Sequence, residues 1–479
     1  MLRGGSSDKI GNRYEDRWTV RCMIDVLQEE ANSIYLEPPG IEGEGVEFYL
    51  QKGNIREYHQ VKRQYSQSGK WTLRDLERKQ VLSNFWHKLQ DSEASCFFVS
   101  IDNAYQLHKL AERAKLATSW DVFKSEFIKA QDSSLDFATL CQLWENCPQQ
   151  KAYEVLKRVY VKTSDEISLR ETVESLLKVF VDGIPDTIAS CLAQYAHDEI
   201  HHELFADDIW NYLQEQGFQR RQWNNDPRVW SFVEKQNERY LSRLQREIII
   251  PDEIIPRDEV QAIVHDLTDA DGKRGVMISG EAGIGKSSSI LQVIRELQER
   301  NYPVLAFRID ILTATSSPKK VGQQLELPES PSCVLASIAD RRECILVIDQ
   351  LDAISEASGR TLLSFDCIHA IINEAQAHRN MRVLLACRKF DLDNDPHFRQ
   401  LLAQNNDISQ ILLTHLSPEK IRDVVTRLGL DAAQLQIRQV EILSVPLHLK
   451  MLSEIVKETT THRVEFETGQ PPKINLPTG

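Results

Sequence analysis

The sequence lacks the features of several protein classes. No apolar run approaches the length of about 18 residues that a membrane span needs, and the start, Met1 to Ser7, has no apolar core of a secretory signal. The nine cysteines include no Cys-x-x-Cys pair, so we expect neither a zinc site nor a disulfide framework. No repeat of fixed period occurs. These absences predict a cytoplasmic chain that makes no membrane contact.

The charge balance limits how the chain meets nucleic acid. Lys and Arg total 57 against 71 Asp and Glu, which gives a formal net charge of −14. Phosphate neutralisation needs clustered Lys and Arg, so we expect any DNA contact to be local or to await assembly with other copies. With 41% hydrophobic and 27% charged residues, the 479-residue chain has the composition of a folded protein of about two or three domains.

Hydrophobic periodicity divides the chain and predicts an α/β fold class. An amphipathic helix and short alternating runs come first, then a stretch with apolar residues every three or four positions. Two prolines in residues 248–256 mark the main boundary, after which β and α patterns alternate again. The predicted segments are 1–115, an α/β domain; 116–247, a helical extension or bridge; 248–412, a parallel-sheet nucleotide-binding domain; 413–465, a helical subdomain; and 466–479, an unstructured tail rich in Pro and Gly.

A glycine-rich segment in the second half fits the phosphate-binding loop pattern. Gly280-Glu-Ala-Gly-Ile-Gly-Lys286-Ser287 follows a short apolar strand and precedes a helix with a buried stripe. The glycines let backbone N–H groups approach phosphates, Lys286 reaches the β and γ oxygens, and Ser287 is a Mg²⁺ ligand at a helix N-terminus. The residues expected to bind ATP here are Gly280, Gly283, Gly285, Lys286, Ser287 and Ser288. The alternative is a chance glycine-rich turn, against which the order of strand, loop and helix argues.

Two further strand patterns end in charged residues. The continuous apolar run 344–348 is typical of a central parallel strand and ends at Asp349, whose carboxylate can hold the water shell of Mg²⁺. Asp352 is a candidate for orienting the attacking water, and a solvated helix N-cap is the alternative. The run 381–387 ends at Arg388, which either senses the γ-phosphate or forms a surface salt bridge.

Together these segments resemble the STAND class of P-loop NTPases, which includes NACHT and NB-ARC proteins, over about residues 250–460. Residues 345–352 look like the second acidic motif of that class and residues 385–388 like its arginine sensor. The class often has two adjacent acids where this chain has Asp352 and Ala353. The resemblance therefore implies ATP binding more firmly than rapid hydrolysis, and we expect a slow switch.

The same resemblance extends into the helical subdomain. Residues 413–419 and 445–449 are similar to the segments that lead into it. The resemblance implies that Pro446 touches adenine and adds His448 to the nucleotide-binding residues.

A second candidate site lies near the N-terminus. The runs 46–50 and 57–62 flank a Lys-Gly-Asn turn and predict a β-hairpin that places Gln60 and Lys62 on one face, with Glu47 across the ladder. An acid, a second oxygen ligand and a lysine form the set that holds Mg²⁺ and positions a hydroxide for phosphodiester attack. Glu47 and Gln60 are then the metal ligands, and Glu15 completes the shell. The alternative is the polar solvent face of an ordinary hairpin.

Resemblance to a nuclease family favours the metal site. Gly11-Asn-Arg-Tyr-Glu15, then Glu47, then Gln60-Val-Lys62-Arg-Gln64, resemble the restriction-endonuclease-like PD-(D/E)xK effector nucleases of bacterial antiphage systems, in the Gln-x-Lys variant. The likeness covers about residues 8–110. Most relatives carry Asp at the position assigned to Glu47, and Glu42 and Glu44 compete for that role.

The combination resembles antiviral STAND (Avs-type) proteins, in which a C-terminal sensor recognises a phage protein, the ATPase oligomerises and the nuclease degrades DNA. It implies an ATP-gated, Mg²⁺-dependent endonuclease that cuts double-stranded DNA and is activated by self-association. The chain stops soon after His448, so we expect either a fragment or sensing of the trigger by a separate chain. The alternatives are a nucleotide-switched scaffold or DNA-binding module with an inactive nuclease domain, and a motor-coupled restriction subunit with fast ATP turnover.

Overall fold

The computed structural model describes residues 4–63, 69–246, 255–269, 272–313, 315, 317–355, 362–404 and 407–467. Two compact units divide between Arg221 and Gln222, and we call them the N-terminal unit and the C-terminal unit. The sequence interpretation instead placed the main boundary at residues 248–256, of which 248–254 lie outside the described residues. Gln64 and residues 468–479 of the expected tail also lie outside them.

The N-terminal unit is built on a six-stranded mixed sheet with the order β5-β4-β3-β2-β1-β7. Its strands are β1 (Ser33–Leu36), β2 (Phe48–Lys52), β3 (Ile55–Lys62), β4 (Ala94–Ser100), β5 (Val159–Thr163) and β7 (Glu203–Phe205). The predicted hairpin is confirmed, because β2 and β3 pair antiparallel with Lys52 opposite Ile55. β3, β4 and β5 run parallel to one another.

Helices cover both faces of this sheet. The helices and short turns are α1 (Gly4–Leu27), η1 (Gly40–Glu42), α2 (Leu73–Arg78), α3 (Val81–Lys88), α4 (Tyr105–Leu116), α5 (Trp120–Val122), the π-helical η2 (Phe123–Phe127), α6 (Gln131–Leu143), α7 (Gln149–Leu156), α8 (Glu166–Phe180), α9 (Pro185–Asp198) and α10 (Ala206–Glu215). On one face, the His59 ring stacks between Phe48 and Phe97 and accepts a 3.1 Å hydrogen bond from Trp18 of α1. The other face packs against α2 to α7.

The segment expected as a helical extension contributes to the sheet of the N-terminal unit. β5 and β7 both come from residues 116–247. The same segment also contains a separate two-stranded sheet, formed by β6 (Val181–Asp182) and β8 (Gln219–Arg220). These strands are short and are flanked by amphipathic helices, so the helical period dominates the local sequence pattern.

The C-terminal unit is built on a five-stranded parallel sheet with the order β10-β11-β12-β9-β13. Its strands are β9 (Gly275–Gly280), β10 (Val304–Arg308), β11 (Cys344–Asp349), β12 (Met381–Arg388) and β13 (Ile408–Leu412). The carboxyl ends of parallel strands meet at one edge of a sheet. Arg308 is accordingly in register with Asp349, and Arg388 with Gly280.

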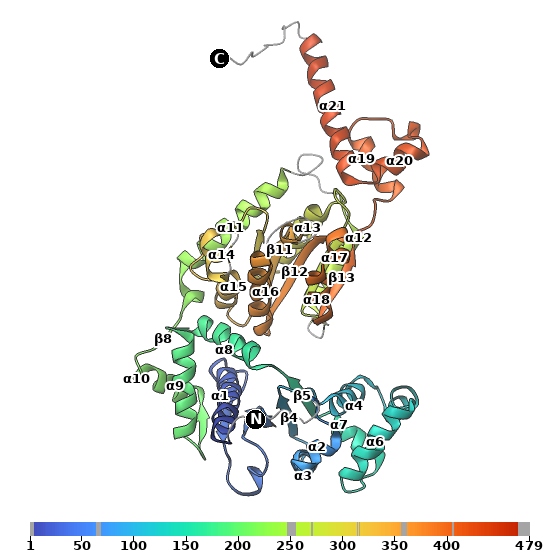
Figure 1. Ribbon diagram of the computed structural model, residues 1–479. Helices are drawn as coiled ribbons and strands as arrows, with labels where there is room; N and C mark the ends of the chain where they lie inside the picture. The colour runs from blue at the N-terminus through green and yellow to red at the C-terminus, as the bar shows by residue number, and fades with distance from the viewer. Residues whose placement is uncertain are drawn as a thin grey trace. The chain divides into compact units, whose positions relative to one another are not determined.

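Helices cover both faces of this sheet as well (Figure 1). One face packs on α11 (Pro227–Gln245), α12 (Asp258–Thr268) and α13 (Lys286–Glu299). The other helices and turns of the sheet region are η3 (Trp223–Asn225), α14 (Pro318–Gln324), α15 (Pro331–Ala339), η4 (Leu351–Ile354), α16 (Leu362–Ala377), α17 (Lys389–Asn394) and α18 (Pro396–Gln404). Of these, α15 packs on β11, and α16 and α17 pack on β12.

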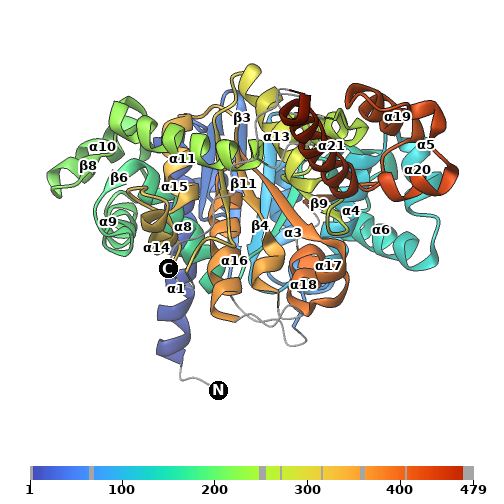
Figure 2. The same ribbon diagram turned by 90° about the horizontal axis from the view of Figure 1, so that it is seen from above.

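The predicted helical subdomain follows the last strand. It comprises α19 (Pro418–Arg427), η6 (Ala432–Gln434), α20 (Ile437–Leu443) and α21 (Pro446–Glu467), which lie together in both ribbon views (Figures 1 and 2). A small core of its own includes Leu416, Ile421, Val424 and Leu449. α21 continues to Glu467, slightly past the predicted end at residue 465.

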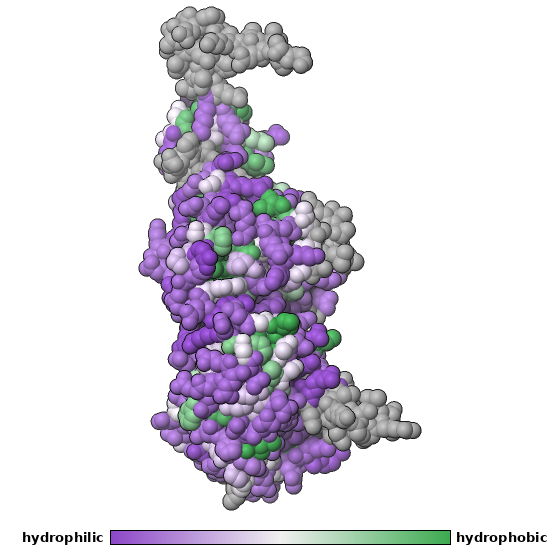
Figure 3. Space-filling model, turned by 90° about the vertical axis from the view of Figure 1, so that its left-hand side faces the viewer, coloured by the Kyte–Doolittle hydropathy of each residue, from purple (hydrophilic) through white to green (hydrophobic). Residues whose placement is uncertain are grey.

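The surface agrees with the polar composition of the chain. The face in Figure 3 is mainly hydrophilic, with apolar side chains in small patches. Among the described helices, none combines the length and the apolar character that crossing a bilayer requires.

Candidate functional site

The phosphate-binding loop has the backbone shape that its glycines predict. It connects β9 to α13, and Gly283 and Gly285 take left-handed φ values of +78° and +98°. A side chain at Gly283 would place its Cβ 2.8 Å from Cβ of Leu447, and one at Gly285 would lie 3.1 Å from Nη2 of Arg257. Glycine is therefore required at both positions, for conformation and for space.

A pocket of about 370 Å³ lies over this loop. It is lined by Ala282, Gly283, Gly285, Lys286, Ser287, Ser288, Gln350, Arg388, Pro446, Leu447 and Lys450. Most residues predicted to bind ATP are thus brought together, including Pro446 from the helical subdomain. Gly280 lies at the base of the loop, at the end of β9. His448 does not line the pocket, and its Nδ1 lies 2.6 Å from the carbonyl oxygen of Ile442.

Lys286 is the first residue of α13 and lines the pocket. Its Nζ donates 3.0 Å hydrogen bonds to the carbonyl oxygens of Gly280 and Glu281. Burial lowers the pKa of Lys286, and the charge of Asp352 opposes this shift. An anionic phosphate would add to the counter-charge of Asp352 beside this half-buried ammonium.

Asp349 lies at the end of β11 and is 1% exposed. Its Oδ1 accepts a 2.8 Å hydrogen bond from the amide of Gln350, and its Oδ2 accepts a 3.1 Å hydrogen bond from the hydroxyl of Tyr240. Gln350, the next residue, lines the pocket. The carboxylate is therefore oriented through both oxygens directly behind the nucleotide pocket.

Asp352 and Arg388 form an ion pair at the same edge of the sheet. Nε of Arg388 lies 3.0 Å from Oδ2 of Asp352, which is 6% exposed. Asp352 lies within the short helix η4, so it is not a solvated N-cap. Oδ1 of Asp352 is buried with no hydrogen-bond partner among the described residues. Arg388 lines the pocket and also forms the predicted salt bridge; its contact with a γ-phosphate stays a prediction.

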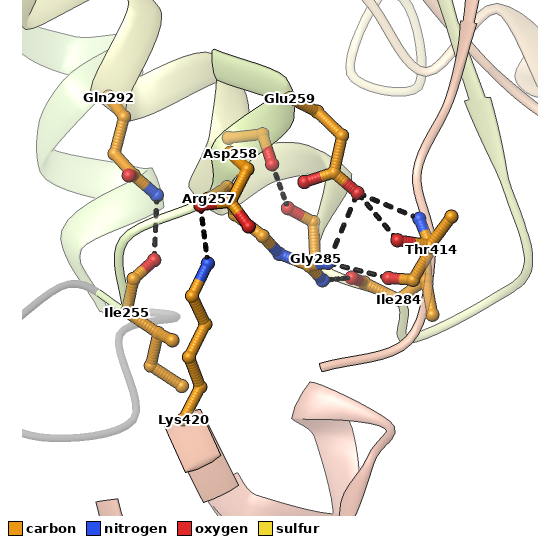
Figure 4. Close-up of polar contacts among 10 residues, drawn as sticks. Ile255, Arg257, Asp258, Glu259, Ile284, Gly285, Gln292, Thr414 and Lys420 are labelled. Carbon is orange, nitrogen blue, oxygen red and sulfur yellow. Dashed lines mark hydrogen bonds and ion pairs between the residues drawn. The ribbon is translucent and has the colours of Figure 1, made fainter. Parts of the chain in front are cut away.

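Arg257, which the sequence analysis did not single out, connects the loop to the end of β13 (Figure 4). Its guanidinium is buried and donates to the carbonyl oxygen of Ile284 in the loop and, at 2.6 Å, to that of Thr414. Glu259 accepts hydrogen bonds from the amide and hydroxyl of Thr414 at 3.0 and 2.9 Å and lies 3.8 Å from Arg257. This network holds the loop against the start of the helical subdomain.

The N-terminal hairpin brings two predicted site residues into contact. Glu47 directly precedes β2, and Lys62 is the last residue of β3. Nζ of Lys62 donates to Oε1 of Glu47 at 2.7 Å, and the amide of Val61 donates to Oε2 at 2.8 Å. Burial raises the pKa of Glu47, although Lys62 and the Val61 amide favour its ionised form.

Glu15 belongs to the same electrostatic group. It lies on α1, and burial followed by the charge of Glu47 raises its pKa to about 7, while Lys62 opposes this shift. A carboxyl group with a pKa near neutrality is typical of acid–base or metal sites, because a nearby cation readily ionises it.

Gln60 is the least accessible member of the set. It is 2% exposed, and its Oε1 has no hydrogen-bond partner in the part of the chain that the structure describes. A buried amide oxygen without a donor loses about 1–3 kcal/mol relative to a satisfied one, so a ligand for it is expected. Within the described ranges, no three His, Cys, Asp or Glu side chains lie close enough to hold a metal ion together.

The competing glutamates lie elsewhere. Glu42 is exposed and pairs with Arg56 at 2.8 Å, and Glu44 is also exposed. Of the three candidates, Glu47 is the one in contact with Lys62. The register of the hairpin makes this distinction, and the sequence had left it open.

Several lining residues were missed. Leu447 and Lys450 follow Pro446 on α21 by one residue and one helical turn, so the predicted proline contact was the signal that could have identified them. Gln350 adjoins Asp349 in the same way. Arg257 and Tyr240 carry no comparable signal, because their partners are far away in the sequence.

Comparisons with known proteins identify the domain that contains the phosphate-binding loop. Residues 276–426 match the model of the ATPase family associated with various cellular activities (AAA). No curated protein matches the sequence. Residues 276–426 therefore form an AAA-family P-loop ATPase domain.

Solved structures with some likeness include three of the replication initiator DnaA. AMPPCP-bound DnaA from Aquifex aeolicus is 14% identical, with a TM-score of 0.29 over 40% of this chain and 57% of that one. DnaA bound to AMPPCP and single-stranded DNA is 13% identical, with a TM-score of 0.30 over 47% and 68%. Domain III of the Thermotoga maritima protein is 12% identical, with a TM-score of 0.28 over 43% and 84%. The chain thus covers less than two thirds of the first of these proteins.

Proposed function

We propose that the AAA-type ATPase domain binds ATP with Mg²⁺ and thereby switches a Mg²⁺-dependent DNA endonuclease in the N-terminal unit. The pocket over the phosphate-binding loop supports the nucleotide part of this proposal, since Lys286, Ser287 and Arg388 all line it. Mg²⁺ at this site would be held by Ser287 and Asp349. The ion would neutralise phosphate charge as it develops during hydrolysis.

The observation that carries the nuclease part is the 2.7 Å contact between Lys62 and Glu47. In this arrangement Glu47, Gln60 and Glu15 are the ligands for Mg²⁺, and Lys62 stabilises charge on the phosphate under attack. Oε1 of Glu47 accepts from Lys62 and Oε2 accepts from the Val61 amide, and because a carboxylate oxygen can accept two hydrogen bonds, these contacts are compatible with metal ligation. The unsatisfied Oε1 of Gln60 fits the same role. The metal would supply a hydroxide at neutral pH by lowering the pKa of bound water.

The finer assignment follows the resemblance. A STAND-type switch is supported by Pro446, which lines the pocket from α21, and by the Arg388–Asp352 ion pair at the strand ends. We propose an antiphage effector that acts on double-stranded DNA when nucleotide-dependent self-association brings several nuclease units onto one duplex. A phage protein, or a separate sensor chain that recognises one, is the proposed trigger.

Plasmid degradation with Mg²⁺ and ATP tests this proposal, at a protein concentration high enough to force self-association. We expect Lys62→Ala to lower the cleavage rate by about 100-fold or more, the loss typical when one charge-stabilising group is removed. Lys286→Ala should weaken ATP binding and thereby abolish the activation of cleavage by ATP.

Lys52→Ala is the matched control for the Lys62 variant. Lys52 lies in the same hairpin, pairs with Glu57 at 2.9 Å and is 21% exposed, against 27% for Lys62. Cleavage that survives Lys62→Ala, or that falls equally in both variants, would overturn the nuclease assignment.

A nucleotide-switched scaffold is the second candidate. It is favoured by the lack, among the residues described, of a group of three metal-binding His, Cys, Asp or Glu side chains. A scaffold would bind ATP and self-associate but leave plasmid intact in every variant. A motor-coupled subunit would instead turn over many ATP molecules per second on DNA.

A further inference from the structure

Helix α11 contributes a buried polar face to the C-terminal unit. The helix begins at Pro227, before the segment that matches the AAA model. Gln236, Asn237 and Tyr240 lie on one side of it and are 6%, 7% and 4% exposed. Buried polar side chains need partners, so their contacts indicate what this helix does.

Two of these side chains pair with the edge strand of the sheet. Nδ2 of Asn237 donates to the carbonyl oxygen of Val304 at 2.6 Å, and the amide of Ala306 donates to Oδ1 of Asn237 at 2.9 Å. Nε2 of Gln236 donates to the carbonyl oxygen of Ala306 at 3.2 Å. The side-chain amide of Asn237 thus makes the hydrogen bonds to β10 that a neighbouring strand would otherwise make. These bonds fix both the rotation of α11 and its position along the strand.

With α11 fixed in this way, its next turn reaches the acidic end of β11. The hydroxyl of Tyr240 donates to Oδ2 of Asp349 at 3.1 Å, and both residues are buried. The backbone amide of Gln350 donates a 2.8 Å hydrogen bond to the other oxygen, Oδ1 of Asp349. The carboxylate expected to face Mg²⁺ is therefore oriented partly by a helix outside the matched ATPase segment.

We propose that Tyr240 is a positioning residue for Mg²⁺ at the nucleotide site, so that α11 is a functional part of that site. This inference rests on the proposed binding of Mg²⁺ and ATP. A donor behind a metal-binding carboxylate fixes its orientation and keeps it ionised while the remaining lone pairs face the metal shell. Loss of such an outer partner typically weakens metal affinity 10–100-fold.

The test is a titration of Mg²⁺ against binding of a fluorescent ATP analogue to the full chain, for wild type and Tyr240→Phe. The substitution removes one hydroxyl and keeps the ring that packs in the core. We expect the free Mg²⁺ concentration at half-maximal effect to rise about tenfold or more. The affinity for the analogue in EDTA should stay unchanged. A general loosening of the fold would instead lower this affinity as well.

Tyr14→Phe is the matched control, because it removes another buried tyrosine hydroxyl, which donates to the carbonyl oxygen of Ser164 at 2.9 Å in the N-terminal unit. It should leave the Mg²⁺ requirement unchanged. A Mg²⁺ requirement that is unchanged in Tyr240→Phe overturns the inference. A lower requirement also overturns it, because the Tyr240 hydroxyl would then compete with the metal for Asp349. A wild type that binds no nucleotide overturns the proposed function itself, which separates the two failures.

Discussion

The substitution Glu15→Gln should stabilise the N-terminal unit in a way that depends on pH. Burial and the charge of Glu47 raise the pKa of Glu15 from 4.5 to about 7, so the folded state binds a proton that the unfolded state releases. Below pH 4.5 both states are protonated and the group contributes nothing. Between pH 4.5 and 7 the unfolded state ionises first, and stability falls; above pH 7 the full penalty is present.

The size of the effect follows from the same two values. A tenfold change in a protonation equilibrium corresponds to about 1.4 kcal/mol, so the two values give a penalty of about 3 kcal/mol at pH 8 and less than about 1 kcal/mol at pH 5, and solvent screening at this half-buried carboxyl group reduces both. A neutral glutamine of the same shape removes this penalty. The variant should therefore gain about 2 kcal/mol more over wild type at pH 8 than at pH 5.

Urea unfolding followed by tryptophan fluorescence measures this difference, since all but two of the eight tryptophans belong to the N-terminal unit. EDTA is present because a metal would favour the ionised carboxylate. Glu93→Gln is the control, because Glu93 is exposed and the variant shows how far the loss of one surface charge changes the free energy of unfolding. An equal gain at both pH values, or a loss at pH 8, would refute the electrostatic reasoning.

Two more predictions concern other parts of the molecule. Gly283→Ala places a Cβ atom 2.8 Å from Cβ of Leu447 on a backbone with a left-handed φ. The resulting strain of about 1–2 kcal/mol in the loop should weaken ATP binding about 5- to 30-fold, as calorimetry would measure. Gly429→Ala, with a φ of +80° and no atom near its Cβ, should leave the affinity unchanged. Of the nine cysteines, all but Cys191 are buried, so a thiol reagent should label that residue first in the native protein, as peptide mapping would detect. Equally fast labelling of the others would contradict this burial pattern.

The phosphate-binding loop was predictable because its function is local. Its glycines, Lys286 and Ser287 are contiguous, and the flanking strand and helix carry clear periodic patterns. The ends of β11 and β12 were predictable for a related reason. A parallel sheet gathers its carboxyl ends at one edge, so Asp349 and Arg388 had to lie near that loop.

The N-terminal site was only partly determined by the sequence. Alternation on two short strands predicted the hairpin, but three glutamates close together in the chain were equally compatible with it. The pairing register distinguishes them by contact, because of the three only Glu47 reaches Lys62 and the amide of Val61; its role as a metal ligand stays a prediction. The nearly neutral pKa of Glu15 depends on burial by α1 packing, which no local pattern encodes.

The sequence by itself determined the two α/β patterns, the nucleotide loop and the residue types of both candidate sites, because each depends on neighbours a few positions apart. Tertiary structure alone decided that β5 and β7 join the N-terminal sheet and that Arg257 links the phosphate-binding loop to Thr414 by hydrogen bonds. It also decided that Tyr240 reaches Asp349, 109 positions along the chain. Such contacts depend on how helices pack on sheets. The periodicity of the sequence predicts which face of a helix or strand is buried, but it does not predict which element packs against that face.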